Sequence, residues 1–172
     1  MLRSLDLPVP LDTRAGTVRL RRASSADLDG LMTLLSDDPI SASRGDVASA
    51  EDAPEYRRAL EEILDDAGND LLVAESAEGR LVGTMQLTRI PGMARRGSTR
   101  LLVEAVRVRS DLRSAGIGGA MMRWVTEVAA PELGSSLVQL TSDAARADAH
   151  RFYERLGFAA SHVGFKYRVP GA

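Results

Sequence analysis

The sequence contains no cysteine, and histidine is scarce. Without cysteine the chain has no disulfide, no cysteine nucleophile and no thiolate ligand for a metal. The two histidines, His150 and His162, are too few and too far apart for a convincing zinc site. We therefore expect chemistry that needs neither a covalent cysteine intermediate nor a bound metal.

The sequence also lacks a strong excess of one charge and any long apolar run. Lys and Arg number 22 against 24 Asp and Glu, so the formal charge is −2, whereas a nucleic-acid-binding domain usually has a strongly basic face. No apolar run approaches the ~20 residues that a membrane-spanning helix needs, and residues 1–6 lack the apolar core of a signal peptide. These absences favour a soluble cytoplasmic protein that binds neither nucleic acid nor membranes.

The size and composition are typical of one globular domain. A chain of 172 residues with 44% apolar residues can bury a hydrophobic core without disulfides or metals. Residues 1–16, rich in Pro, Asp and Arg, are expected to form a loose N-terminal leader, and residues 17–169 to form the domain. No repeat or linker indicates a second domain.

The apolar periodicity predicts an α/β (α+β) fold. Alternation and short apolar runs between turn residues predict strands at 17–21, 71–75, 81–87, 100–109, 137–141 and 160–169. Helical spacing predicts helices between 24 and 39, at 51–67, from within 110–119 to 130, and at 145–156. This order predicts a single domain with a mixed central sheet of six to seven strands and about four flanking helices, its late strand–helix–strand units pairing in parallel.

A glycine-rich turn at 110–119 joins a predicted strand to a predicted helix. Helix N-termini have free N–H groups and partial positive charge, so they bind phosphates. Gly116 and Gly118 lack side chains that would block a pyrophosphate, and Arg113 adds a positive charge. The alternative is a tight turn whose glycines serve packing. The spacing fits neither a Walker A loop nor a Rossmann fingerprint.

A second motif follows later in the chain: Ala149, Phe152, Tyr153, Gly157 and Phe158. The two motifs resemble those of the GCN5-related N-acetyltransferase (GNAT) family, Arg/Gln-x-x-Gly-x-Gly/Ala and Ala-x-x-Leu/Phe-Tyr-x-x-x-Gly-Phe. Both occur in the family's order, and the predicted elements from residue 17 onward also fit. The resemblance implies a GNAT-like domain that uses acetyl-CoA as co-substrate, acts on an amine acceptor and forms a homodimer.

The resemblance also implies where acetyl-CoA binds. The turn amides would hold the CoA pyrophosphate, through Arg113, Ser114, Ala115, Gly116, Ile117, Gly118 and Gly119. The strand backbone at Val106, Arg107 and Val108 would pair with the pantetheine arm, and the thioester would lie where this strand and the 137–141 strand splay apart. Arg146 replaces an asparagine that binds pantetheine in many members, and an arginine there could instead contact a CoA phosphate.

Two residues are candidates for proton transfer during amine acetylation. Tyr153 is the candidate acid, because a phenol with an ordinary pKa near ~10 is protonated at neutral pH and can donate to the leaving sulfur. Glu104 is the candidate base, since a period of two places it on one strand face with Val106 and Val108, where partial burial would raise its pKa. The structural alternatives are core packing for Tyr153 and, for Glu104, an ion pair with Arg100 or Arg107 or a solvated position near a strand end.

The sequence motifs do not specify the acceptor amine. We expect a small-molecule amine; a protein Lys or N-terminal acetyltransferase, a degenerate acyl-CoA-binding sensor and, more weakly, a nucleotide-binding protein are the alternatives. Acceptor specificity is expected from residues 24–67 and the 90–98 loop, because function depends on the site and not on the fold. Acidic residues near this region could attract a cationic amine: Asp37, Asp38, Asp46, Glu51 and Asp52.

Overall fold

The computed structural model of the protein describes residues 1–43 and 45–170. The chain forms two compact units, Met1–Leu140 and Thr141–Ala172. The first contains the whole sheet and most helices, and the second contains α7 (Ala147–Arg155).

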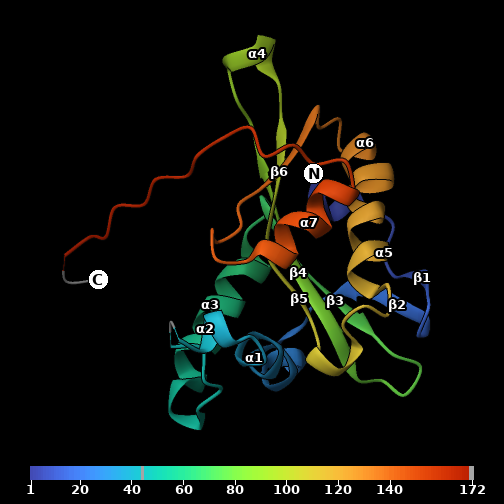
Figure 1. Ribbon diagram of the computed structural model, residues 1–172, viewed down its shortest axis with the longest axis vertical. Helices are drawn as coiled ribbons and strands as arrows, with labels where there is room; N and C mark the ends of the chain where they lie inside the picture. The colour runs from blue at the N-terminus through green and yellow to red at the C-terminus, as the bar shows by residue number, and fades with distance from the viewer. Residues whose placement is uncertain (44, 171–172) are drawn as a thin grey trace. The chain divides into compact units, whose positions relative to one another are not determined.

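The first unit contains a six-stranded sheet in which neighbouring strands are also successive in sequence (Figure 1). The strands are β1 (Val9–Thr13), β2 (Gly16–Arg22), β3 (Asn69–Glu75), β4 (Leu81–Ile90), β5 (Arg100–Val108) and β6 (Leu137–Leu140). All neighbours pair antiparallel except β5 and β6, which are parallel and joined through a helix. The predicted mixed sheet of six to seven strands is confirmed.

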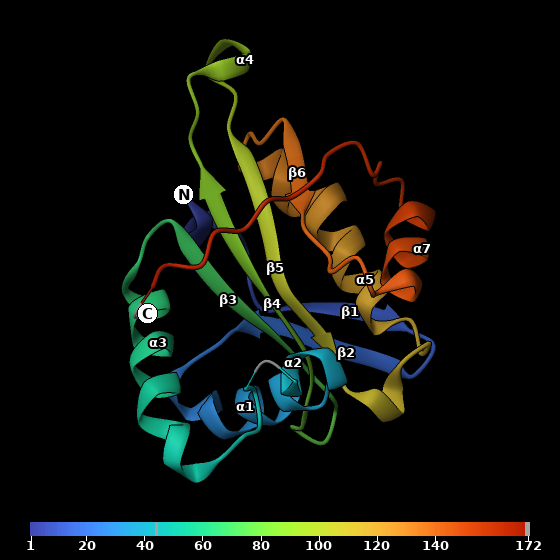
Figure 2. The same ribbon diagram turned by 60° about the vertical axis from the view of Figure 1, so that its left-hand side comes forward.

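Helices cover both faces of this sheet (Figure 2). One face carries α1 (Leu28–Ser36), α2 (Pro39–Ala42) and α3 (Ala53–Asp65), and the other carries α5 (Ile117–Trp124). The axis of α5 continues through the π-helical turn η5 (Val125–Ala129) into α6 (Ala130–Glu132). The remaining short segments are η1 (Leu2–Ser4), η2 (Ser25–Asp27), η3 (Ala50–Asp52), α4 (Ala94–Gly97) and η4 (Ser110–Leu112). Of these, α4 forms the tip of the β4–β5 hairpin (Figure 1).

Alternation along the strands divides the core between the two faces. On the α1–α3 face a cluster joins residues of both helices to β3: Leu28, Leu31, Met32, Leu60, Leu71 and Val73. The α5 face buries Leu72 and Met85, and α5 buries Met121, whose Sδ would lie 3.1 Å from a Cβ placed on Gly83. The helix residues Met121, Met122 and Trp124 are buried, as predicted for core positions.

The N-terminal segment is ordered, and the expectation of a loose leader at 1–16 is wrong. Leu2 and Leu5 are buried, and β1 pairs with β2 to form an antiparallel hairpin. Arg22 holds the segment by donating to the Leu2 and Leu5 carbonyls at 3.0 and 3.1 Å. The composition misled because Pro and Asp are rare in strands, whereas an edge strand such as β1 tolerates Pro10.

The strand predicted at 160–169 is absent in the structure. These residues form no ladder within the described part of the chain, and Val163, Phe165 and Tyr167 are 80%, 93% and 86% exposed. Period-two alternation favours an extended backbone, but a strand also needs a neighbour that accepts and donates its hydrogen bonds. A period-two pattern does not show whether such a neighbouring strand is present.

Candidate active site

The turn between β5 and α5 has the backbone of an anion-binding site. Ser114 (φ 64°) and Gly116 (φ 92°) adopt left-handed conformations before α5 begins at Ile117. The first bond of the helix joins the Ala120 N–H to the Gly116 carbonyl at 2.9 Å, so the N–H groups of 117–119 precede the helical ladder. Amides in this position carry partial positive charge and bind phosphates. The predicted pyrophosphate residues at 113–119 therefore share one continuous turn with suitable chemistry.

The tip of the β1–β2 hairpin holds this turn from one side. Arg14 donates from its backbone N–H to the Ala115 carbonyl at 2.9 Å, and from its guanidinium to the Ser114 carbonyl. A Cβ on Gly116 would lie 3.4 Å from the Arg14 nitrogen, on a residue whose φ already disfavours side chains. Arg14 was not among the predicted site residues, because residues 1–16 were expected to form a loose leader.

The end of α1 holds the turn from the other side. The Asp37 carboxylate accepts the Ser110 N–H at 2.5 Å, and the Asp37 carbonyl accepts the Arg113 guanidinium at 3.0 Å. Arg113 is exposed and lies beside the turn, as predicted, with part of its guanidinium committed to α1. The turn is thus fixed before any ligand binds, which lowers the entropic cost of binding.

The edge of β5 beside β6 is paired along only half its length. Parallel pairing runs from Arg100–Leu137 to Val103–Leu140, and β5 then continues to Val108 beyond the end of β6. From Glu104 onward this edge of β5 has no ladder partner among the described residues. The resemblance implies that the thioester lies here, and this stays a prediction. A ligand can add to such an edge as an extra strand. At this edge the Val106 carbonyl accepts the guanidinium of Arg107 at 2.9 Å, and Arg107 also donates to Ser41 Oγ in α2 at 2.6 Å.

A β-bulge changes the expected position of Glu104. Gln86 pairs with Glu104 but Thr84 pairs with Arg107, so two residues of β5, at 105 and 106, oppose one residue of β4. Ala105 has a φ of 50°. A bulge of this kind shifts the alternation by one residue, which places Glu104 and Val108 on opposite faces.

The expectation that Glu104, Val106 and Val108 share one face is therefore wrong. The expected partial burial of Glu104 is also wrong, because its side chain is exposed. The bulge is the physical reason for the first error, and no periodicity argument contains it. The two arginines considered as ion-pair partners of Glu104 also donate to other groups: Arg100 donates to Gln139, and Arg107 donates to Ser41 and Val106.

A cavity of about 220 Å³ lies between α1, α3 and strands β3 to β5. Ala105 of the bulge and Gln86 on β4 border it, and most of the remaining wall is aliphatic. At its margin the Tyr56 hydroxyl donates to the Asp46 carboxylate at 2.6 Å, and this hydrogen bond, with burial, raises the pKa of Tyr56 to about 12. The apolar stripes of the two helices were predicted from sequence, but the space between them was not.

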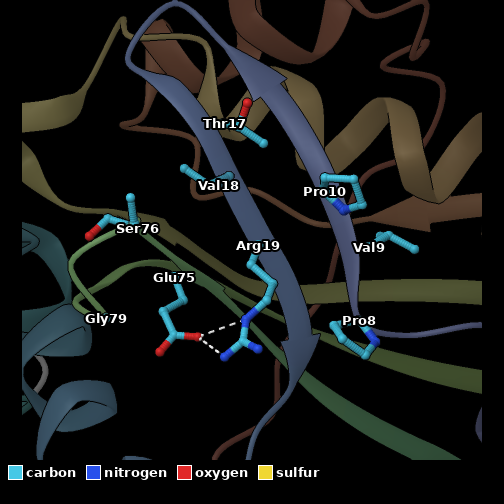
Figure 3. Close-up of a pocket in the computed structure, with 10 residues that line it drawn as sticks. Pro8, Val9, Pro10, Thr17, Val18, Arg19, Glu75, Ser76 and Gly79 are labelled. Atoms are coloured by element: carbon cyan, nitrogen blue, oxygen red, sulfur yellow. Dashed lines mark hydrogen bonds and ion pairs between the residues drawn. The ribbon is translucent and has the colours of Figure 1, made fainter.

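A larger hollow of about 510 Å³ lies over β1, β2 and the β3–β4 turn (Figure 3). Its main charged groups neutralise each other, because the Glu75 carboxylate accepts hydrogen bonds from Arg19 and Arg21, which lower the pKa of Glu75. It is lined by neither the glycine-rich turn nor the bulge of β5. We therefore place the candidate site at the turn, the bulge and the smaller cavity.

The second unit carries the remaining predicted residues, Tyr153 and Arg146. The Tyr153 ring makes edge contacts with Phe152 and Phe158, with centroids 5.0 and 5.9 Å apart. Gly157 has a φ of 87°, which confirms the predicted helix-ending glycine. Arg146 is the N-cap residue of α7. The catalytic role of Tyr153 and the ligand contact of Arg146 remain predictions.

Within residues 1–43 and 45–170, no three His, Cys, Asp or Glu side chains are placed to hold a metal ion. No helix in the same ranges has the length and apolarity required to cross a membrane.

Comparison with known proteins identifies the family. Residues 29–158 match the model of the acetyltransferase (GNAT) family. The chain belongs to this family, and the resemblance inferred from the two motifs is confirmed. The match includes the glycine-rich turn, β5 and α7.

Individual relatives show how far the similarity extends. A transcriptional regulator from Bacillus halodurans C-125 is 40% identical, with a TM-score of 0.82 over 88% of this chain and 99% of that one. An acetyltransferase from Trypanosoma brucei is 25% identical, with a TM-score of 0.70 over 88% and 99% of the two chains. The aminoalkylphosphonate N-acetyltransferase of Salmonella typhimurium is 35% identical over 63 residues, which are 37% of this chain and 40% of that protein. The chain therefore aligns with less than half the length of this curated relative.

Proposed function

We propose that the protein transfers the acetyl group of acetyl-CoA directly to a primary amine on a small molecule. The observation that carries this proposal is the preformed turn at 113–119, located at the end of a bulged strand whose edge extends beyond its neighbour. Family membership supports the same reaction class. The domain would span residues 17–169, with the β1 strand added to its sheet.

In this proposal the turn amides bind the pyrophosphate, and the β5 edge at Val106, Arg107 and Val108 orients the pantetheine arm. The ammonium first gives one proton to the base, and the neutral nitrogen forms a bond to the thioester carbonyl carbon. The C–S bond then breaks, and the nitrogen loses a second proton to become the amide N–H. The sulfur keeps the electron pair and takes a proton. Glu104 serves as base, with its exposure favouring a relay through water, and Tyr153 protonates the sulfur.

The relatives support a small-molecule acceptor and also one alternative. The Salmonella relative is named for an aminoalkylphosphonate, a small amine, which favours a small acceptor here. The Bacillus halodurans relative is called a transcriptional regulator, which favours an acyl-CoA-binding sensor as the second candidate. Turnover separates the two, because a sensor binds acetyl-CoA without acetylating an amine.

Three further properties belong to the proposal: a cytoplasmic location, contact of Arg146 with a CoA phosphate, and a homodimer. Exposed apolar side chains at 163, 165 and 167 support the homodimer, because isolated chains rarely expose such groups together. Size-exclusion chromatography of the full chain with light-scattering detection would give twice the monomer mass for a dimer.

The proposed reaction is tested by incubating the protein with acetyl-CoA and a panel of primary amines. We expect free thiol to appear together with an acetylated amine identified by mass spectrometry. Tyr153→Phe should lower kcat by about 10²-fold or more, since general acid catalysis typically contributes that much. Acetyl-CoA binding without acetylation of any amine, including peptides with free Lys or N-termini, would contradict the proposal and favour the sensor.

A further inference from the structure

We infer that the acceptor is an amphiphilic amine whose compact apolar body occupies the cavity beneath α1 and α3. Its amino group would lie beside the Ala105 bulge and Glu104. This inference rests on the proposed acetyl transfer and names the chemical class of its acceptor. A short alkyl chain or a single aromatic ring is the class of body that the cavity fits.

The size and walls of the cavity support an apolar occupant. Its volume is about 220 Å³, and an apolar cavity of ~150 Å³ is enough to hold benzene. The wall includes Leu31 and Met32 of α1, Ile63 of α3 and Leu71 of β3. A charged phosphonate or a sugar would lose its hydration against these walls without compensation.

The polar side chains that border the cavity already donate within the protein. The Thr84 hydroxyl donates to the Leu72 carbonyl at 2.8 Å, and the Tyr56 hydroxyl donates to Asp46. Gln86 donates to Asn69 Oδ1 at 2.9 Å. The interior therefore offers few donors to a polar acceptor, and discrimination by hydrogen bonding would be weak there.

A carboxylate that suits a cation lies next to one wall of the cavity. Glu104 pairs with Gln86 across the ladder, and Gln86 borders the cavity, so Glu104 lies on the same face of the sheet. Its exposed carboxylate adjoins Ala105, another wall residue. An alkylammonium ion can thus place its charge near Glu104 while its carbon chain leaves water, which combines electrostatic attraction with the hydrophobic effect.

The kinetic test compares straight-chain amines from ethylamine to hexylamine with 2-aminoethylphosphonate and ethanolamine. We expect kcat/KM to rise about fourfold per added methylene until the cavity is filled, because each buried CH₂ contributes about 0.8 kcal/mol. Ala59→Phe introduces a ring at the border of the cavity from an exposed position of α3. It should lower kcat/KM for hexylamine by about tenfold or more and leave ethylamine nearly unchanged. The matched control Ala67→Phe, at an exposed position outside the cavity lining, should change neither.

A second measurement tests the cavity without turnover. Methionine methyl groups are labelled with ¹³C, and phenethylamine is titrated while their NMR signals are followed. The Met32 methyl lines the cavity and should shift, whereas Met121, buried by α5 on the other face of the sheet, should not. The methyl signal that disappears in the Met32→Leu variant is the signal of Met32.

The outcomes separate this inference from the proposed function. Acetyl transfer to amines without a gain from chain length, together with an unmoved Met32 signal, would overturn the inference and leave the proposed function intact. A shifted Met32 signal without acetylation of any amine would support the cavity as an amine site and overturn the proposed function. Neither transfer nor shift would overturn both.

Discussion

The carboxylate of Asp27 connects the start of α1 to the sheet. Its two oxygens accept the Arg21 guanidinium at 2.8 Å each, and one also accepts the Ser24 N–H at 2.8 Å. Asp27 is buried, and the hydrogen bonds from Arg21 are the main reason why its pKa is lowered. Because α1 bounds both the glycine-rich turn and the cavity, this single carboxylate supports two parts of the candidate site.

Replacing Asp27 by Asn should lower the free energy of unfolding by about 2–3 kcal/mol near neutral pH, because charge-assisted hydrogen bonds are lost. A lowered folded-state pKa contributes stability above the unfolded value near ~4, and this contribution is lost as the pH falls through the folded-state pKa. The difference between wild type and variant should therefore shrink in acid. Urea denaturation across this pH range measures it, and a difference that stays constant or grows in acid would contradict the account.

The sequence predicts β5, the glycine-rich turn and α5 in the right order, but it does not predict the bulge in β5. The order and type of β5, the turn and α5 followed from apolar periodicity and glycine spacing, because these signals are local. The bulge at Ala105 and Val106 depends on how β5 aligns with β4, and that register is a tertiary property. Glu104 was accordingly assigned to the right strand but to the wrong environment.

The N-terminal hairpin is a second feature that depends on tertiary pairing and not on local sequence. Val9–Thr13 forms a strand although its composition favours coil, because pairing with β2 outweighs local preference. Its tip then places Arg14 against the carbonyls of Ser114 and Ala115. No local pattern in the sequence relates positions separated by about a hundred residues, so this contact between the hairpin and the turn could only be found in the structure.

We expect Arg14→Ala to weaken acetyl-CoA binding by about three- to tenfold, since it removes a hydrogen bond that fixes the glycine-rich turn. The fold should remain, because Arg14 is exposed at a hairpin tip. Isothermal titration compares the dissociation constants. Arg19→Ala is the control, because Arg19 is another exposed arginine of the hairpin that pairs with Glu75 and makes no contact with the turn. Equal losses of affinity in both variants would show a general charge effect instead.

At the scale of the whole molecule, the family and the fold were predictable from two separated motifs and the order of elements. Residues 29–158 match the family model, and the sheet has the predicted mixed topology. The chemistry of the acceptor was not predictable, because the cavity arises from how two helices pack on three strands. Each apolar residue in its wall is also an ordinary core residue when considered alone.

The central claim, that the turn between β5 and α5 binds the CoA pyrophosphate, is tested most directly by calorimetric titration of acetyl-CoA. Gly118→Trp should abolish the binding by filling the space in front of the turn amides. The control Gly164→Trp should preserve it, because Gly164 is exposed and a Cβ added there would meet nothing within 4 Å. We predict dissociation constants on the order of micromolar, about 8 kcal/mol of binding free energy, for wild type and control. Unchanged binding by a folded Gly118→Trp protein, or no binding by wild type, would contradict the account.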